Sequence, residues 1–245
     1  MPVVPDLDRP ERRKLVDADG MPLARFVHVE RDGRVVADLF ELEVPVQRAL
    51  PTILADLGGM RVAGTEALGR ALVAAGGTPV RHAHVYSHGL RERPTPRLPA
   101  GLRFAAADRP AADLLPAYLA SHPPDHVDAH VLVAEDSRAH LARILSGELG
   151  RALEGSALAI DADDRVVGAI LVNEFVDTDP PFGGPWVMEV FRAPGARGAG
   201  RALLERALAV TEGTLGLAVT HGNPAERLYV ALGFERVFTA FSVDL

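Results

Sequence analysis

The chain has 245 residues, of which 48% are hydrophobic and 24% charged, and its formal net charge is −7. This length and composition predict one large or two small globular domains with a buried core. Cysteine is absent, which excludes disulfides and cysteine-ligated metal and predicts a reducing, cytoplasmic setting. The proline- and charge-rich start lacks the apolar core of a secretion signal, and no run of about 18 apolar residues predicts a membrane span. The acidic balance argues against a nucleic-acid partner.

The first part of the chain, residues 1–95, predicts a small α/β region without a motif that indicates a function. Its first 20 residues are polar and proline-rich, and we expect them to be loosely ordered. Two strands over residues 25–44, two helices that end at glycine pairs, and a strand near residues 79–90 follow. The segment Arg91–Gly101 contains three prolines and three arginines and is the expected linker.

The second part, residues 96–245, predicts a mixed α/β domain of ordinary size. A short strand and two helices come first, and the second helix is expected over Glu135–Leu149. A hairpin with an Asp-Asp turn and the strand WVMEVFR follow, separated by a loop rich in proline and glycine. A helix, a strand, a short helix and a last strand complete the order β-α-α-β-β-β-α-β-α-β.

A glycine-rich loop, GARGAG at residues 195–200, joins the strand WVMEVFR to the next helix. Glycines at such a junction let backbone N–H groups approach a ligand closely, and the start of a helix favours an anion. Arg197 and Arg201 add positive charge beside these amides. The pattern predicts a site for a pyrophosphate, although no GK[ST] follows as in a Walker loop. A flexible connection in an Ala/Gly-rich sequence explains it equally well.

A second segment, HGNPAERLYVALGF at residues 221–234, predicts a short helix. Asn223 is a typical N-cap, and the proline after it suits the first helical position. Leu228, Tyr229 and Leu232 share one face, and Gly233 ends the helix. Alone, this pattern predicts a capped helix with a tyrosine in the core.

Together, the two segments resemble the GNAT superfamily of acyl-CoA-dependent N-acetyltransferases over about residues 102–245. The residues RGAGRA, 197–202, satisfy the family's signature [QR]-x-x-G-x-[GA]. The apolar stripe of the helix fits better when the loop is read from Gly195, which puts glycine where Arg or Gln is usual. Asn223 and the sequence LYVALGF match the family's later signature. The resemblance implies an α/β (α+β) fold with a mixed, mostly antiparallel sheet flanked by helices.

The resemblance further implies direct transfer of an acetyl group from acetyl-CoA to a primary amine of a small molecule or peptide, without a metal. Tyr229 would protonate the departing CoA thiolate, a role that suits a neutral phenol held by a helix. A homodimer is compatible with this reading, and no membrane partner is expected. The implied cofactor-binding residues are Val190, Arg192, Arg197, Gly198, Ala199, Gly200, Arg201 and Asn223.

The sequence does not decide whether Glu189, Glu174 or a water molecule is the general base. Glu189 lies in the strand where family members often carry acidic residues that face the acceptor. Strict alternation puts its side chain opposite Met188 and Val190, on whose face the family's usual base falls. A β-bulge there would re-aim Glu189. A solvated or partnered strand carboxylate is the alternative for each residue.

Two groups of histidines require separate readings. His82, His84 and His88 lie in one expected strand, and ordinary strand histidines fit them better than metal ligands. A polar segment between the first two helices of the second part borders the acceptor site by resemblance, and an exposed loop is its alternative. Its polar residues are His122, Asp125, His126, Asp128 and His130.

The sequence also allows two alternative functions and contains one short internal repeat. The first alternative is a catalytically inactive acyl-CoA-binding sensor, which the uncertain general base favours. The second is a nucleotide- or phosphate-binding protein, which would explain the glycine-rich loop but not the segment around Tyr229. Residues 68–73 repeat the pattern of residues 199–204, which suggests that the first part is a degenerate half-copy of the second. Chance similarity of Ala/Leu/Arg-rich helices explains the repeat equally well.

Overall fold

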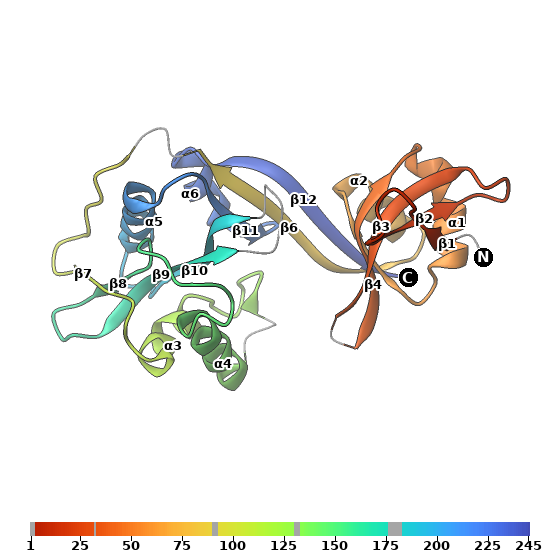
Figure 1. Cartoon of the computed structure of the whole chain (residues 1–245). Coiled ribbons are helices and arrows are strands. Elements are labelled where there is room, and N and C mark those ends of the chain that lie inside the picture. Colours follow the sequence, from red (N-terminus) through yellow and green to blue (C-terminus); the bar gives the residue numbers. More distant parts are fainter. Residues whose placement is uncertain (1–2, 32, 90–92, 130–132, 176–182) are drawn as a thin grey trace. The chain divides into compact units, whose positions relative to one another are not determined.

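The computed structural model describes residues 3–31, 33–89, 93–129, 133–175 and 183–245, which form two compact units (Figure 1). The first unit comprises Met1–His84 and Phe238–Leu245, and the second comprises Val85–Val237. Two long strands, β6 (Thr78–His88) and β12 (Glu235–Asp244), therefore contribute residues to both units. These units follow spatial contacts, and the functional division between residues 95 and 96 stays a prediction.

The first unit is built on one sheet with the strand order β1-β2-β3-β4-β5-β12. Neighbouring strands from β1 to β4 are antiparallel, β5 is parallel to β4, and the end of β12 is antiparallel to β5. Its further elements are β1 Val3–Pro5, β2 Arg12–Val16, β3 Pro22–Arg31, β4 Arg34–Leu42, α1 Val46–Asp56, β5 Arg61–Gly64 and α2 Glu66–Ala74.

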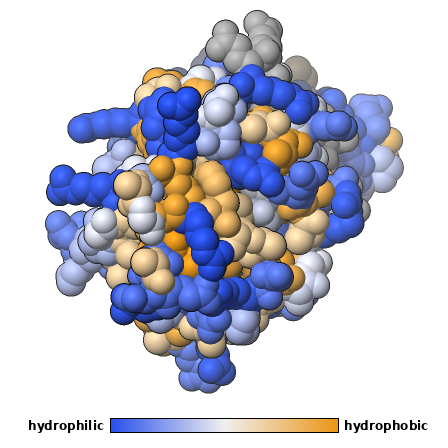
Figure 2. All heavy atoms as spheres, turned by 90° about the vertical axis from the view of Figure 1, so that its left-hand side faces the viewer, coloured by the Kyte–Doolittle hydropathy of each residue, from blue (hydrophilic) through white to orange (hydrophobic). Residues whose placement is uncertain are grey.

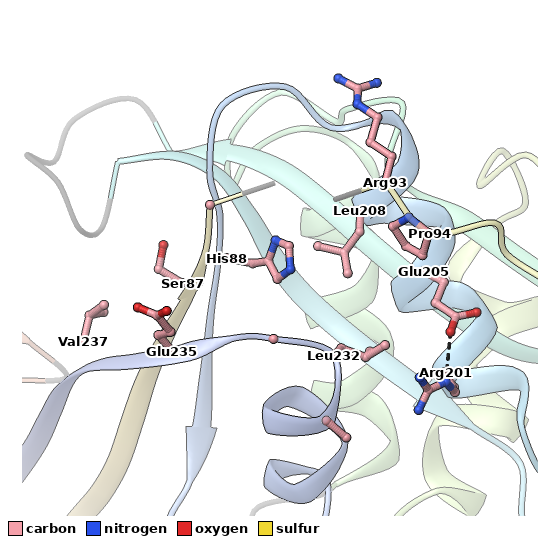
Figure 3. Close-up of a pocket in the computed structure, with 13 residues that line it drawn as sticks. Ser87, His88, Arg93, Pro94, Arg201, Glu205, Leu208, Leu232, Glu235 and Val237 are labelled. Atoms are coloured by element: carbon pink, nitrogen blue, oxygen red, sulfur yellow. Dashed lines mark hydrogen bonds and ion pairs between the residues drawn. The ribbon is translucent and has the colours of Figure 1, made fainter. Parts of the chain in front are cut away.

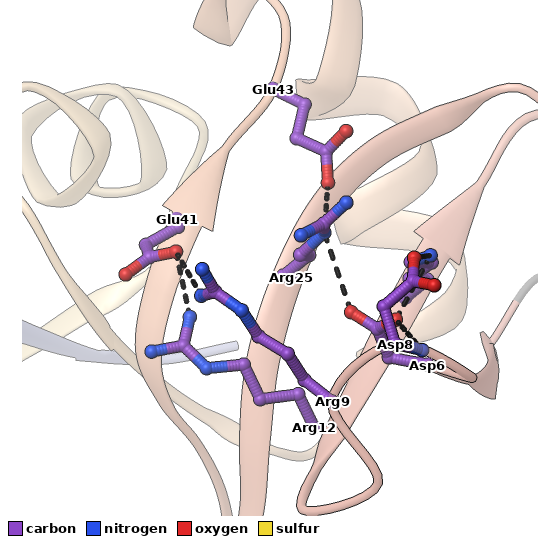
Figure 4. Close-up of polar contacts among 8 residues, drawn as sticks. Asp6, Asp8, Arg9, Arg12, Arg25, Glu41 and Glu43 are labelled. Atoms are coloured by element: carbon purple, nitrogen blue, oxygen red, sulfur yellow. Dashed lines mark hydrogen bonds and ion pairs between the residues drawn. The ribbon is translucent and has the colours of Figure 1, made fainter.

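The expectation of a loosely ordered start is wrong for the residues described, because β1 and β2 join the sheet. Leu15 is fully buried, and Asp6 is only 1% exposed. The Asp6 carboxylate lies 2.9 Å from the Lys14 ammonium and 3.4 Å from Arg25 Nε, and Arg25 also pairs with Glu43 (Figure 4). These ion pairs compensate for the burial of a carboxylate. They join residues from different strands, so the polar composition alone did not indicate them.

The core of the first unit depends on the end of β12. Phe241 and Val243 belong to its buried cluster, and the ring of Phe241 stacks on His82 with centroids 4.5 Å apart. A methyl group on Gly69 of α2 would overlap the Phe241 ring. Glycine therefore allows the close approach of α2 to β12.

The second unit has the strand order β6-β11-β10-β9-β8-β7. Its strands are antiparallel from β7 to β10, whereas β10 and β11 are parallel. Helices α3 and α4 cover one face of this sheet and α5 covers the other (Figure 1). The predicted fold class is confirmed, as is the predicted order of elements. They are β7 Arg103–Ala105, α3 Ala111–Ala120, α4 Ala134–Leu145, β8 Ala157–Ile160, β9 Val166–Phe175, β10 Gly184–Arg192, α5 Ala199–Val210, β11 Leu215–Thr220 and α6 Glu226–Ala231, followed by β12.

The described part of the expected linker, residues 93–101, packs against the second unit. The Arg93 guanidinium donates a hydrogen bond to the Ala209 carbonyl of α5, and Leu98 packs on the core beneath. Pro99 lies against Gly198 at the other end of that helix. Figure 2 shows this side of the molecule, where hydrophobic side chains gather in the centre of a mostly polar face. None of the helices described is long and apolar enough to cross a membrane.

The two halves of the sequence repeat one order of elements: an antiparallel hairpin, a helix, a strand parallel to the second hairpin strand, another helix and a final strand. The members are β3-β4-α1-β5-α2-β6 and β9-β10-α5-β11-α6-β12. The half-copy thus exists in topology. The sequence repeat is a wrong guide to it, because it aligns α2 with α5, whereas topology aligns α1 with α5.

Candidate active site

The site forms around the second half of β10, where this strand loses its partner on one edge. Trp186 pairs with Gly216 and Val187 with Leu217 of β11. Over the rest of the described strand, up to Arg192, the recorded pairing is with β9 alone. An unpaired strand edge presents backbone N–H and C=O groups that can bind an extended ligand.

A β-bulge in β10 decides where Glu189 points. Val187 pairs with Val172 of β9, and the register then shifts so that Glu189 pairs with the next residue, Leu171. Met188 packs against the α3–α4 core, and Glu189 also contacts these two helices. The expectation that alternation separates Glu189 from Met188 is therefore wrong, because the bulge brings both to one face.

The Glu189 carboxylate is held through one of its two oxygens. His140 Nε2 lies 2.9 Å from Oε1, and the Tyr118 hydroxyl donates to the same oxygen over 3.3 Å. Within the described chain, Oε2 has no hydrogen-bond partner. Burial and the negative charge of Glu189 raise the pKa of Tyr118, so its hydroxyl stays a donor.

The competing carboxylate, Glu174, lies in a different environment. Its Oε2 is 2.7 Å from Arg151 Nη2 and 3.0 Å from Arg151 Nε, in a largely exposed ion pair. The structure thus brings Glu189, and not Glu174, to the buried tyrosines of the second unit.

Tyr229 of α6 is 5% exposed, and its ring lies among those of Tyr86 and Phe234. Burial, followed by the negative charges of Glu189 and Asp128, raises the pKa of its phenol. The phenol is therefore neutral and a hydrogen-bond donor at physiological pH. The three residues are close enough to interact electrostatically, although they lie far apart in sequence.

Tyr86 provides a contrast within the same core. Its hydroxyl donates a hydrogen bond to the Glu226 carboxylate at the start of α6. Burial and this bond raise the pKa of Tyr86 to about 12. This phenol supports the helix that carries Tyr229.

Asn223 lies in the turn before α6. Its Oδ1 accepts the Ala225 N–H over 2.9 Å, and its Nδ2 donates to Asp128 Oδ2 over 3.1 Å. The predicted N-cap role of Asn223 is wrong, since α6 begins at Glu226 with Ala225 as its N-cap; Asn223 lies two residues before that cap and closes the turn there. Asn223 therefore links the two segments that sequence reasoning singled out separately.

The histidines between α3 and α4 lie beside this link. His126 Nδ1 accepts the Asp128 N–H over 3.1 Å, and its ring lies 4.8 Å from that of His122. Burial and then the charge of His122 lower the pKa of His126. Asp125 is exposed, and His130 lies outside the described residues.

The glycine-rich loop presents free amides at the start of α5. Gly198 is the N-cap with φ 86°, a left-handed conformation that favours glycine. The described chain supplies no hydrogen-bond acceptor for the N–H groups of Arg197, Gly198, Gly200 and Arg201, whereas the Ala199 N–H bonds to the Ala196 carbonyl. N–H groups without an acceptor at the start of a helix can bind a phosphate group.

The arginines near the loop have separate positions. The Arg192 guanidinium donates to the carbonyls of Ala193 and Pro194, both over 3.1 Å, and so braces the loop from within. Arg197 is exposed. Arg201 pairs with Glu205 one turn along the helix at 2.9 Å.

A pocket of about 700 Å³ begins at this first turn of α5 (Figure 3). Arg201, Glu205 and Leu208 line it from α5, and the end of α6 lines it with Leu232. His88 of β6 also points into it. The other two histidines of this strand lie in the first unit, where His84 Nδ1 is 2.9 Å from Thr239 Oγ1 and His82 stacks on Phe241.

Sequence reasoning missed Tyr118 and His140. Each lies in a predicted helix, and His140 adjoins the buried stripe of Ser137, Leu141 and Ile144. A titratable residue beside an apolar stripe is a usable signal for a side chain that points toward the sheet. That signal does not indicate which strand residue it meets.

The fold is that of the GNAT acetyltransferases. The structure is similar to a GCN5-related N-acetyltransferase from Sphaerobacter thermophilus, with a TM-score of 0.59 and 18% identity over 95% of this chain and 79% of that one. It is also similar to a GNAT-family acetyltransferase from Colwellia psychrerythraea, with a TM-score of 0.53 and 12% identity over 96% of this chain and 85% of that one. A functionally unknown conserved protein from Staphylococcus epidermidis ATCC 12228 gives 0.54 and 12%, over 94% and 92% of the two chains. No protein-family model and no curated protein sequence matches the chain.

These similarities cover both units, whereas the sequence resemblance concerns the second part. At such low identity they concern the fold, and the chemistry has to be argued from the site itself.

Proposed function

We propose that the protein is an N-acetyltransferase that transfers an acetyl group directly from acetyl-CoA to a primary amine of a small molecule or peptide. One observation carries this proposal. Glu189, with one carboxylate oxygen free, lies on the part of β10 that has one unpaired edge, and it is within electrostatic reach of the buried phenol of Tyr229. A proton acceptor and a proton donor in one site are what amide formation from a thioester requires.

The loop residues fit the pyrophosphate of CoA. The free N–H groups of Arg197, Gly198, Gly200 and Arg201 support this assignment, and Ala199 contributes the start of the helix. Arg192 acts by bracing the loop. The adjacent pocket is lined by Arg93 and Arg201 but also by Glu205 and Glu235, so it adds no net positive charge for the adenosine end of CoA.

The remaining two cofactor-binding residues, Val190 and Asn223, are proposed to bind the pantetheine chain of CoA. Val190 lies on the part of β10 that pairs with β9 on one edge only. On the other edge, backbone groups can bind the amides of pantetheine and polarise the thioester carbonyl. The side-chain Nδ2 of Asn223 carries two N–H bonds, of which one is donated to Asp128, while Oδ1 accepts from Ala225. The second N–H of Nδ2 is proposed to bind the pantetheine chain.

Tyr229 is the proposed acid. Acetyl-CoA supplies the acetyl group as a thioester whose leaving group is a thiolate, and a thiol has a pKa of about 8.5. The phenol is neutral and its position is fixed by burial. It can therefore donate its proton to the sulfur as negative charge develops there.

Glu189 is the proposed base, acting directly or through water. An alkyl amine has a pKa of about 10 and is protonated at neutral pH, so a proton must leave before the nitrogen can attack. The Glu189 carboxylate also attracts the cationic form of the acceptor. The segment from His122 to Asp128 borders this side of the site and is proposed to contribute to recognition of the acceptor.

The decisive experiment measures free thiol release from acetyl-CoA with a panel of amines, amino acids, polyamines and peptides. Acceptor-dependent release supports the proposed enzyme and identifies its substrate class. Tight CoA binding without release would indicate an acyl-CoA-binding regulatory module instead. Thermal stabilisation by ATP or NAD, and not by CoA, would indicate a nucleotide-binding protein. A cytoplasmic location and the absence of metal, nucleic-acid and membrane partners are part of the proposal.

A further inference from the structure

Two carboxylates of the second unit are each held through one oxygen. Glu189 of β10 bonds to His140 and Tyr118 through Oε1. Asp128, in the segment between α3 and α4, accepts the Asn223 side chain through Oδ2 over 3.1 Å. In the described chain, neither Oε2 of Glu189 nor Oδ1 of Asp128 has a hydrogen-bond partner. The two side chains are 21% and 26% exposed, so a small ligand can reach both.

These two carboxylates differ from the others in the kind of residue that faces them. Both are paired with histidine, whereas all other ion pairs recorded in the described part of the second unit contain arginine. Arginine is always charged, but a neutral imidazole leaves the charge of a carboxylate uncompensated. The single lysine of the chain, Lys14, lies in the first unit.

The histidine beside Asp128 is neutral. Its Nδ1 accepts the Asp128 backbone N–H over 3.1 Å, so this nitrogen of His126 carries no proton. Burial and then the charge of His122 lower the pKa of His126, which is consistent with this assignment. The negative charge of Asp128 is therefore available to a cationic ligand at neutral pH.

A row of three rings connects the two carboxylates. Tyr118, whose hydroxyl bonds to Glu189, has its ring centroid 5.1 Å from that of His122. The ring of His122 lies 4.8 Å from that of His126, which in turn bonds to the Asp128 backbone. Aromatic rings pack against hydrocarbon and attract cations. The row therefore suits a hydrocarbon chain with a positive charge at its end.

The phenol of Tyr229 gives a separate indication that a ligand binds here. It is 5% exposed, and its hydroxyl has no hydrogen-bond partner recorded in the described chain. Burial, followed by the charges of Glu189 and Asp128, raises the pKa of both Tyr229 and Tyr118. Both carboxylates thus act on the same two phenols and belong to one site. A buried donor without a protein partner is available to a ligand at that site.

We propose that the acceptor is a small aliphatic diamine, with its reacting amino group at Glu189 and its second amino group, still protonated, at Asp128. The inference rests on the proposed function and names the substrate class of the same site. Asp128 only binds the second ammonium, which takes no part in the bond changes and keeps its proton. Two anchors at the ends of the chain orient the reacting nitrogen toward the thioester.

Other amines fit this arrangement less well. A simple alkylamine leaves Asp128 without a cation. An amino acid brings its own carboxylate toward a site that already holds two, and such like-charge contacts oppose binding. The far end of the acceptor therefore decides its affinity.

The test measures thiol release from acetyl-CoA by the unmodified protein with matched acceptors. Putrescine is compared with butylamine and γ-aminobutyrate, and cadaverine with pentylamine, so that only the far end of the chain changes. For at least one diamine, kcat/KM should exceed that of its monoamine by about 10-fold or more, and γ-aminobutyrate should be the poorest acceptor. Equal values for diamines and monoamines, or a preference for γ-aminobutyrate, overturn the inference while the proposed function stands.

Asp128→Asn removes the charge and keeps an oxygen that can accept the Asn223 N–H. It should raise the KM for the diamine by about 10-fold or more and leave kcat/KM for the monoamine unchanged, which also shows that the variant is folded. Asp163→Asn is the matched control, because it removes a carboxylate that is 70% exposed in the turn between β8 and β9. It should behave as the unmodified protein.

An unchanged KM for the diamine in Asp128→Asn overturns the assignment of the second amino group. The comparison of acceptors needs no variant, so it decides the substrate class even where Asp128→Asn does not fold. A lack of thiol release by the unmodified protein with every amine would remove the proposed function, and the inference with it.

Discussion

Tyr229 and Tyr86 are two buried phenols whose ring centroids lie 6.3 Å apart, yet their hydroxyl groups have different surroundings. The hydroxyl of Tyr86 is bonded to Glu226. That of Tyr229 has no hydrogen-bond partner recorded in the described chain and is influenced by the charges of Glu189 and Asp128. A donor left without a protein partner in a core is available to a ligand.

We therefore expect Tyr229→Phe to lower kcat by about 100-fold or more, with little change in the affinity for CoA. Thiol release gives kcat, and calorimetry with CoA gives the affinity. Tyr86→Phe makes the same chemical change nearby and should keep most of the turnover. Equal rates for Tyr229→Phe and the unmodified protein would remove Tyr229 as the acid.

Gly198 combines a left-handed backbone with a close neighbour. Its φ is 86°, and a Cβ there would lie 3.1 Å from Pro99 Cγ. Gly198→Val should shift the loop and weaken acetyl-CoA binding by about 10-fold or more, an effect of about 1.4 kcal/mol. Binding is measured by calorimetry.

Gly213→Val is the matched control for this change. Gly213 has φ 80° and open space around it, at the other end of α5. It should cost similar backbone strain, about 1–3 kcal/mol of stability, and leave binding unchanged. Normal binding by Gly198→Val would contradict the assignment of the loop to the pyrophosphate.

At this scale the sequence indicates candidate residues within single segments, but not how these segments meet. The loop glycines and Tyr229 were proposed as site residues because local turn and helix patterns carry them. The side of the sheet that Glu189 faces depends on a bulge, which has no clear local signal in VMEV. His140 was missed because its contact with Glu189 joins residues of separate elements.

At the scale of elements, the first two strands depend on the buried carboxylate of Asp6. Burial raises its pKa, but hydrogen bonds from Lys14 and the Asp8 amide, with the charges of Lys14 and Arg25, outweigh this and lower it. A carboxyl with a lowered folded pKa stabilises the folded state fully above its unfolded pKa of about 3.9. That contribution is lost as the pH falls through the lower folded value.

The protection factors of β1 and β2 in hydrogen exchange should therefore fall below about pH 4, and those of Asp6→Asn should be lower already at neutral pH. Asp8→Asn is the control, because Asp8 pairs with the same Lys14 at 3.3 Å but is 78% exposed. Exposed pairs contribute about 0–1 kcal/mol, so this variant should resemble the unmodified protein. Identical exchange of Asp6→Asn and Asp8→Asn would show that burial of Asp6 contributes nothing.

The end of β12 is the second element with a clear prediction. Phe241→Ala should destabilise the first unit by about 3–5 kcal/mol, because its ring fills the space between α2 and the sheet. Chemical unfolding measures the loss, and Val35→Ala at a 40% exposed strand position should change stability by less than about 0.5 kcal/mol. A similar small effect of Phe241→Ala would show that the first unit does not rely on this strand.

At the scale of the whole molecule, each unit is completed by residues from the other part of the chain. The first unit contains Phe238–Leu245, and the second contains Val85–His88. Separate fragments 1–95 and 96–245 should therefore each show weak protection in hydrogen exchange, and mixing them should restore it. Two independently folded fragments would contradict this interdependence and favour two self-sufficient domains.

Most elements of the fold were predicted because local signals mark them. The Thr65 side chain caps α2, and Gly76 follows this helix with φ 102°. Helix α4 ends at Leu145, before the predicted Leu149, since Gly147 adopts φ 80°. The sharing of β6 and β12 was not predicted, because strand pairing between distant residues leaves no periodic pattern in the sequence.

The shared strands also affect how the protein emerges from the ribosome. Residues 3–84 are made first, but the core around Leu72 and Phe241 cannot close until β12 has been synthesised. The early part must remain incompletely folded during translation of the entire second unit, at about 5–20 residues per second. A premature stop near residue 237 would spare nearly every residue proposed for catalysis and still expose the N-terminal sheet to aggregation and proteolysis.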